Sequence, residues 1–241
     1  MTCPCSPGVP VPDQPTPAPT TWADRTLSEQ NVRHAALEGV ILERCTLPEL
    51  DLRGTELSGL VLRDCTATGC RLDHATADGL RVLGGRWDAT RWDSADLCDA
   101  RFEGVDLAHA SFEQALLSGA VLDGCRLSGT RLSATRGLGF TLAGGTAFAA
   151  DLTGAQLEGN TFGGTRLTEA VLARAVLRGA TFDGCDLLGA QLEGADLAGA
   201  DLRGAGLPED LPLEQLTGAV VTPAQLARLA GAQLGVVVQE A

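Results

Sequence analysis

Histidines, cysteines and neighbouring carboxylates are the side chains in this sequence that could act as proton donors, nucleophiles or metal ligands. The three histidines, His34, His74 and His109, lie far apart in the chain, and the sequence contains neither tyrosine nor lysine. Carboxylates such as Asp93 and Asp96 lie close together, but they occupy positions that are polar throughout the chain, as on a solvated surface. We therefore expect no enzyme active site, no cofactor and no metal.

The eight cysteines do not form a metal-binding or disulfide pattern. No Cys-x-x-Cys pair is present, and the first residues lack the basic and then apolar pattern of a signal peptide. Five cysteines instead fall on one recurring position, where a thiol would serve as a compact apolar filler. These five are Cys45, Cys65, Cys70, Cys125 and Cys185. We expect a cytoplasmic protein with structural thiols, and leave a role for Cys3 and Cys5 open.

Composition excludes several classes of protein. The 241 residues carry a formal net charge of −13, which opposes direct binding to nucleic-acid phosphates. No stretch approaches the roughly 18 apolar residues of a membrane helix. Aromatic residues make up only 4% of the chain, whereas glycine occurs 30 times. A large aromatic core is therefore not what holds this chain together.

A fixed period of five residues supplies the alternative. Of the 35 positions taken every fifth residue from Leu37 to Leu207, 24 are leucine and 4 are phenylalanine. The residue two places earlier is alanine, cysteine, threonine, valine or glycine in 30 of the 35 pentads. This period matches neither an α-helix nor a flat strand. It fits a chain that makes about a quarter turn per pentad, with the large and the small side chain pointing inward.

These pentads, such as Ala195-Asp196-Leu197-Ala198-Gly199, resemble those of the pentapeptide repeat protein family. The resemblance implies an all-β solenoid, namely a right-handed quadrilateral β-helix with four pentads per coil. The 35 pentads would then form about nine coils, or a rod on the order of 40 Å at ~4.8 Å per coil. The resemblance also implies a column of aligned side chains inside the β-helix. In this chain the column consists of Phe102, Leu122, Leu142, Phe162 and Phe182.

The pattern divides the chain into four parts. Residues 1–20 hold seven of the eleven prolines and are expected to be a disordered tail. Residues 21–34 are expected to cap the first coil, residues 35–209 to form the β-helix, and residues 210–241 to form a C-terminal cap. Thr222-Pro223-Ala224-Gln225 has the form of a capping box, which predicts a helix over about 223–234.

One stripe of this predicted helix is apolar, and it has two compatible interpretations. It would shield the last coil, or it would join two chains into a homodimer through their C-terminal ends. Gyrase-directed members of the family that this chain resembles pair in the second way. The stripe consists of Leu226, Leu229, Ala230 and Leu234.

The repeat is irregular around residues 137–148. The large positions hold Gly137 and Ala147, Phe140 takes a small position, and Leu138 and Phe148 fall where the surface should be. This zone is either a tolerated packing irregularity or a binding feature that bulges outward.

One face of the expected β-helix is more acidic than the others. Pentads 20 residues apart share a face, and the face that carries Leu57, Leu97 and Leu157 has seven carboxylates against two arginines, for a net charge of 7 − 2, or −5. We call it the acidic face. Its carboxylates are Glu38, Glu56, Asp78, Asp96, Asp99, Glu158 and Asp196.

The resemblance and the acidic face together suggest a function. A stiff acidic rod can compete for a cationic groove that holds duplex DNA, and quinolone-resistance members of the family are understood to act in this way on DNA gyrase. Because no insertion interrupts the pentads, the chain resembles the loop-free members. The alternatives are a scaffold for an unknown protein partner, which would use residues such as Phe148 and Leu188, and a substrate of a modifying enzyme that docks on the N-terminal tail.

Overall fold

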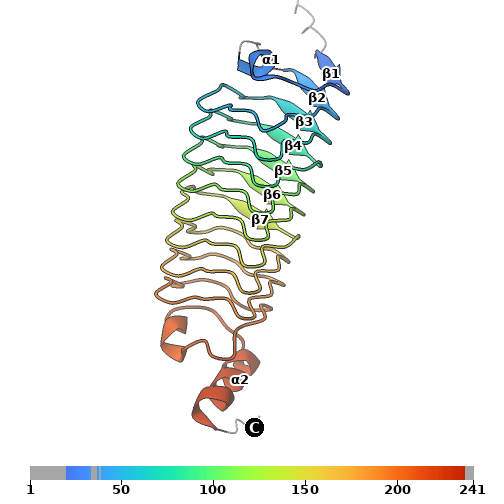
Figure 1. Ribbon diagram of the computed structural model, residues 1–241. Coiled ribbons are helices and arrows are strands. Elements are labelled where there is room, and N and C mark those ends of the chain that lie inside the picture. Colours follow the sequence, from blue (N-terminus) through green and yellow to red (C-terminus); the bar gives the residue numbers. More distant parts are fainter. Residues whose placement is uncertain (1–19, 34–36, 38, 237–241) are drawn as a thin grey trace, which may run out of the picture.

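The described chain is a parallel β-solenoid that runs from β1 at one end to helix α2 at the other (Figure 1). This computed structural model describes residues 20–33, 37 and 39–236. Almost all of the expected proline-rich tail, as well as Glu38 and His34, therefore lies outside the described residues. The predicted solenoid fold is confirmed.

Seven short parallel strands form the sheet on one face of the solenoid. Each strand pairs with the strand exactly one coil later, so that partners differ by 20 residues, as in Ile41 with Val61. The strands are β1 (Thr21–Ala23), β2 (Ile41–Glu43), β3 (Val61–Arg63), β4 (Arg81–Leu83), β5 (Arg101–Glu103), β6 (Val121–Asp123) and β7 (Thr141–Ala143).

The named strands span about six turns, fewer than the nine coils expected for the repeats. Beyond β7 the pairing on this face contracts to single residues with the same offset, from Thr141 to Thr161, Thr181 and Asp201. The three remaining faces are joined only by such single-residue bridges, because a sharp turn follows almost every large side chain. The named strands therefore cover fewer coils than the pentads predict, although the bridges keep the same 20-residue offset beyond β7.

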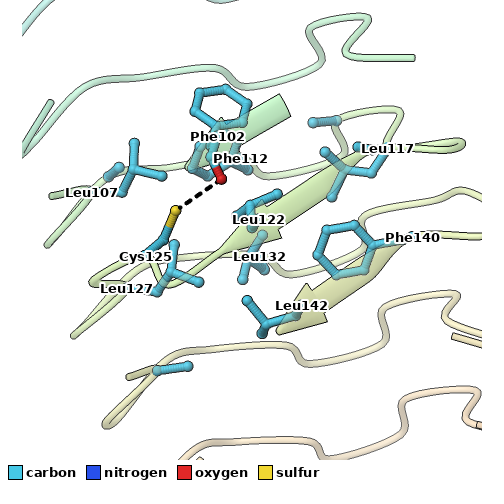
Figure 2. Close-up of a cluster of buried hydrophobic side chains, with 14 of the residues drawn as sticks. Phe102, Leu107, Phe112, Leu117, Leu122, Cys125, Leu127, Leu132, Phe140 and Leu142 are labelled. Carbon is cyan, nitrogen blue, oxygen red and sulfur yellow. Dashed lines mark hydrogen bonds between the residues drawn. The ribbon is translucent and has the colours of Figure 1, made fainter. Parts of the chain in front are cut away.

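Large side chains fill the axis of the solenoid, as the pentad pattern predicts. Phe102, Leu122 and Leu142 are paired across β5, β6 and β7 and are completely buried. Phe162 and Phe182 continue this stack with their rings nearly parallel and 4.8 Å apart. Figure 2 shows the Phe102, Leu122 and Leu142 part of this stack, with Phe140 beside the leucines. The irregular Phe140 thus fills the interior from a small position, and only 1% of it is exposed.

Threonines and cysteines at the small position also satisfy backbone carbonyls inside the solenoid. The Thr130 hydroxyl donates to the Leu107 carbonyl one coil below at 2.9 Å, and the Thr135 hydroxyl donates to Leu132 at 2.8 Å. The Cys125 thiol donates to the Phe102 carbonyl at 3.3 Å (Figure 2). Burial raises the pKa of this thiol to about 11, so it stays protonated and can donate.

Glycine is indispensable at some corners. Gly145 has φ +67°, and a Cβ built on it would lie 2.1 Å from the Cys125 carbonyl oxygen of the coil below. Gly154 has a similar φ of +64°, but nothing lies within 4 Å of its Cβ position. Gly145 is favoured by both backbone conformation and space. At Gly154 only the conformation favours glycine, and Ala89, Ala134 and Ala149 adopt the same left-handed conformation at equivalent corners.

Short helices lie near both ends of the described chain. Helix α1 (Glu29–Arg33) follows β1, and Leu27 and Val32 are buried at that end. The 3₁₀ helix η1 (Leu213–Leu216) and helix α2 (Pro223–Leu234) follow the last coil. The predicted capping box is present, since Thr222 Oγ1 accepts from the Gln225 N–H while the Gln225 side chain accepts from the Thr222 N–H. Within the described chain, no helix is long and apolar enough to cross a membrane.

Candidate interaction surface

The acidic face is a continuous column of residues. Parallel bridges link Glu56, Thr76 and Asp96 at successive 20-residue steps, and the same column continues to Asp196. Glu56, Asp78, Asp99 and Glu158 are exposed, whereas Asp96 and Asp196 are partly buried. Six of the seven predicted carboxylates therefore lie on one side of the solenoid, and the seventh, Glu38, lies outside the described residues.

Ion pairs are scarce on this face. Among the described residues it has one, between Arg178 Nε and Asp196 Oδ2 at 2.5 Å. On the other faces, arginines repeatedly pair with carboxylates of the same or the adjacent coil, as in Arg126 with Asp106 at 3.0 Å. Of the six described carboxylates of the acidic face, five therefore have no ion-pair partner among the described residues.

Two pKa shifts report the electrostatics of the acidic face. The pKa of the Cys98 thiol is raised to about 11, first by burial and then by Asp96, Asp78 and Asp99 around it. The pKa of Asp196 is lowered, first by a hydrogen bond from the Ala198 N–H and then by Arg178. The Cys98 environment shows that several carboxylates act together at one place.

A recess interrupts the acidic face near its middle. It has a volume of about 320 Å³ and lies beside Leu138, the most exposed large apolar side chain of the described chain at 72%. We call it the Leu138 recess. Its lining consists of Leu116, Ser118, Gly137, Leu138, Gln156 and Glu158.

The C-terminal helix α2 closes the solenoid with polar side chains. Gln225 Nε2 donates to the carbonyls of Leu202 and Ala205 at 2.8 and 2.9 Å. Arg228 Nη2 donates to the Leu207 carbonyl, and Gln233 Nε2 donates to the Leu211 carbonyl. These bonds satisfy carbonyls that no further coil covers.

The predicted apolar stripe of α2 is divided between two environments. Leu229 is completely buried and Ala230 partly so, whereas Leu226 and Leu234 are 47% and 65% exposed. Val220 and Val236 are also exposed nearby in the chain. Only part of the stripe covers the solenoid, and the remainder is an exposed apolar surface at its end.

Away from the acidic face and the C-terminal end, two large apolar side chains are exposed. Phe148 and Leu188, on a different face, are 45% and 46% exposed. No group of histidine, cysteine and carboxylate side chains suited to a metal ion occurs among residues 20–33, 37 and 39–236. Leu116, Ser118 and Gln156 were not predicted as part of a site. Leu116 and Gln156 are each 20 residues from Arg136, and Ser118 is 20 residues from Leu138, so the coil length alone places them beside the irregular zone.

Comparison with known proteins provides a family match and structural matches. A family model described as pentapeptide repeats matches residues 95–135, 150–189 and 185–207, in eight copies. A trypsin-treated variant of QnrB1, a plasmid-mediated fluoroquinolone resistance protein, has a TM-score of 0.57 at 18% identity, covering 91% of this chain and 98% of that one. A second such variant has a TM-score of 0.51, also at 18% identity, with 92% and 99% covered.

HetL, a pentapeptide repeat protein involved in heterocyst differentiation regulation from Nostoc sp. strain PCC 7120, gives a TM-score of 0.46. Its sequence identity is 23%, and the match covers 77% of this chain and 86% of HetL. No curated protein matches the sequence. The two matches to QnrB1 variants establish a shared fold.

Proposed function

The chain is a pentapeptide repeat protein, and on that premise we propose that it is a non-enzymatic DNA mimic that binds DNA gyrase or a related type II topoisomerase. The observation that carries the proposal is the acidic face, on which exposed carboxylates repeat along one side of a rigid rod with a single arginine partner among the described residues. Such a surface can occupy a cationic groove that responds to shape and charge before sequence. Binding in this way would inhibit gyrase or protect it from a poison.

The similarity to QnrB1 supports a role in fluoroquinolone resistance. QnrB1 is a fluoroquinolone resistance protein, and nearly its whole length is matched by this chain. At 18% identity the similarity carries no residue-level argument, so the proposal rests on the charge distribution of this chain.

A homodimer joined at the C-terminal ends is part of the proposal. Val220, Leu226 and Leu234 are exposed apolar side chains beyond the last coil, and burying them against a second copy would remove this surface from water. Two rods joined end to end would double the length of the acidic surface presented to a partner.

A scaffold for another protein is the second candidate function. It is favoured by the exposed Phe148 and Leu188, which lie away from the acidic face. A scaffold that binds through these two side chains would be insensitive to the charge of the acidic face. The two functions are therefore separable by mutation.

The test is a gyrase supercoiling assay with increasing protein, with and without a fluoroquinolone. The wild-type protein should inhibit gyrase or rescue it from the drug at micromolar concentration, and the effect should weaken as salt is raised. Reversing Glu56, Asp78, Asp99 and Glu158 together to arginine should abolish it without unfolding the solenoid, because all four side chains are exposed.

A control variant separates specific loss from the change in net charge. It reverses four exposed carboxylates on other faces, and so changes the net charge by the same amount. These four are Glu103, Asp123, Asp183 and Glu193. Equal loss in both variants, or no effect of the wild-type protein on gyrase, would exclude the DNA mimic.

A further inference from the structure

Three backbone hydrogen bonds join each coil to the next on the face that carries Leu172 and Leu192. The Leu172 and Arg174 N–H groups donate to the carbonyls of Gln191 and Glu193 in the next coil, at 2.7 and 2.9 Å. The Gln191 N–H in turn donates to the carbonyl of residue 170 at 2.9 Å. The same three bonds recur at this face through the preceding coils.

In the last coil the equivalent groups have no partner among the described residues. The Leu192 and Gly194 N–H groups donate to no acceptor, and the Ala190 carbonyl accepts from no donor. The Gly189 N–H, at the preceding corner, is also unpaired. We call these four backbone groups the open edge. An unpaired edge of this kind is a template for pairing with a further strand.

Two prolines explain why the chain does not cover the open edge. Pro212 lies 20 residues after Leu192, where the pentad pattern requires a large inward side chain, and Pro208 lies at the exit from the last coil. Neither proline has an N–H to donate to a ladder. The segment bonds to itself instead, since the Leu211 N–H donates to the Pro208 carbonyl at 3.3 Å. It therefore turns away from the edge instead of extending along it.

Two recesses border the open edge. The larger has a volume of about 440 Å³ and lies between residues 189–193 and the segment that carries Pro208, Leu211 and Gln215. The smaller, of about 340 Å³, is lined by Ala173, Arg174, Glu193 and Gly194. Glu193 lines both, so the two recesses meet at the edge. The edge thus has space beside it for a further chain.

Carboxylates outnumber arginines among the residues that line these recesses. Glu193 and Asp210 are both exposed, and Arg174 of the preceding coil is the one cation in the two linings. Within the described chain, neither Glu193 nor Arg174 forms an ion pair. The charge beside the edge therefore favours a cationic occupant over an anionic one.

An ion pair elsewhere in the solenoid indicates where that cation would lie. Glu43 pairs with Arg63 in the next coil at 3.2 Å, in the pentad position directly after the large side chain. Glu193 has the same pentad position, but no coil follows it on this face. A cation one coil beyond Glu193 would reproduce the pair.

We propose that the open edge binds an extended basic segment of a protein partner by strand addition. Residue i of the segment donates to the Ala190 carbonyl and accepts from the Leu192 N–H, and the carbonyl of residue i+2 accepts from the Gly194 N–H. The side chain of residue i+2 is arginine or lysine and pairs with Glu193. A helix cannot make these bonds, because its own backbone groups are already paired. The inference goes beyond the proposed function, since it concerns the end of the rod and not the acidic face.

The first experiment uses a peptide as the probe. Acetyl-Val-Thr-Ala-Arg-Val-amide, in which Thr-Ala-Arg stands for residues i to i+2, is titrated into the isotope-labelled full-length protein and followed by NMR. Saturable shifts should be confined to the amides of Gly189, Leu192, Gly194 and their neighbours. Methylation of the threonine nitrogen removes the donor to Ala190 and should weaken binding about fivefold, as expected for the loss of one hydrogen bond.

Two variants of the protein test the charge. Glu193→Gln should weaken peptide binding about threefold, as expected for an exposed ion pair. Glu103→Gln removes an exposed carboxylate from the same pentad position on another face and should leave binding unchanged. The proposal is overturned if shifts are absent or spread over all carboxylates, or if the methylated peptide or the Glu193→Gln protein gives full binding.

Hydrogen exchange of the free protein tests for another occupant of the edge. The Leu192 and Gly194 amides should exchange rapidly in the free protein and more slowly when the peptide is bound. Slow exchange without peptide would mean that another part of the chain already covers the edge, or a second copy if the protection rises with protein concentration, and either result would overturn the proposal. A negative supercoiling assay would end the proposed function and leave this inference standing.

Discussion

Asn160 is an exception among the residues at small positions. It is completely buried, and its side-chain oxygen and nitrogen both lack a hydrogen-bond partner. Threonines in the same position of other pentads all donate to a backbone carbonyl, either three residues earlier, as Thr90 does to Trp87 at 2.7 Å, or in the coil below, as Thr130 does to Leu107. A buried amide without partners costs free energy that a threonine would not.

We expect Asn160→Thr to raise the free energy of unfolding by about 1 kcal/mol, because the new hydroxyl can donate to the Leu157 carbonyl while an unpaired amide is removed. Thermal and denaturant unfolding of the two proteins measures the difference. Thr165→Asn is the reciprocal control, since Thr165 now donates to the Leu142 carbonyl at 3.0 Å, and it should be destabilising. A less stable Asn160→Thr protein would mean that the amide has partners, such as buried water.

Turns restrict the sequence most where the glycine also lies against the backbone of the coil below, as Gly145 does. Gly145→Ala should lower the free energy of unfolding by about 3 kcal/mol or more, because the left-handed conformation and a contact with the Cys125 carbonyl both oppose the methyl group. Gly154→Ala should cost only about 1 kcal/mol, since it meets the conformational penalty alone. Equal losses in denaturant unfolding would contradict the steric argument.

Helix α2 acts as a cap through hydrogen-bond donors. Gln225→Glu keeps an acceptor for the capping box but replaces the donors to Leu202 and Ala205 with a carboxylate that faces two carbonyls. We expect it to destabilise the C-terminal end by about 2 kcal/mol. Hydrogen exchange of the last coil should report the loss. Ala224→Glu adds the same charge at the adjacent exposed position and should be neutral.

The sequence was sufficient to predict elements that depend on periodicity. The five-residue repeat predicted the solenoid, the inward side chains and the outward position of Leu138, and the capping box predicted α2 at its observed bounds. Each follows from local pattern, because a large residue in the wrong phase cannot reach the axis. The pattern also placed the carboxylates on one face.

Partners of individual side chains could not be predicted in this way. The donation from Gln225 and Arg228 to the last coil depends on how α2 docks. The pairing of Arg178 with Asp196 depends on rotamers as well as on their 18-residue separation. None of these has a signature in the spacing of residue types.

At the scale of the whole molecule, the exposed end of the rod has a testable consequence. If Leu226 and Leu234 are buried in a homodimer, the molar mass from light scattering should be twice that of the chain, and Leu234→Arg should yield monomers. Leu188→Arg places the same charge at an exposed leucine on another face and should leave the dimer intact. A monomeric wild-type protein at micromolar concentration would exclude the homodimer.

The 20-residue register of the bridges sets a rule for insertions and deletions. Most pentads supply one large and one small side chain to the interior, so removing one regular pentad or four would leave the axis filled in a similar way. The outside differs, because losing five residues turns everything beyond the cut by a quarter of a revolution and moves Asp196 away from the column of Glu56 and Asp96. The interior pattern thus repeats every five residues, whereas the pattern of each face repeats every twenty. If selection acts on the acidic face, related rods can change length only by whole coils of twenty residues.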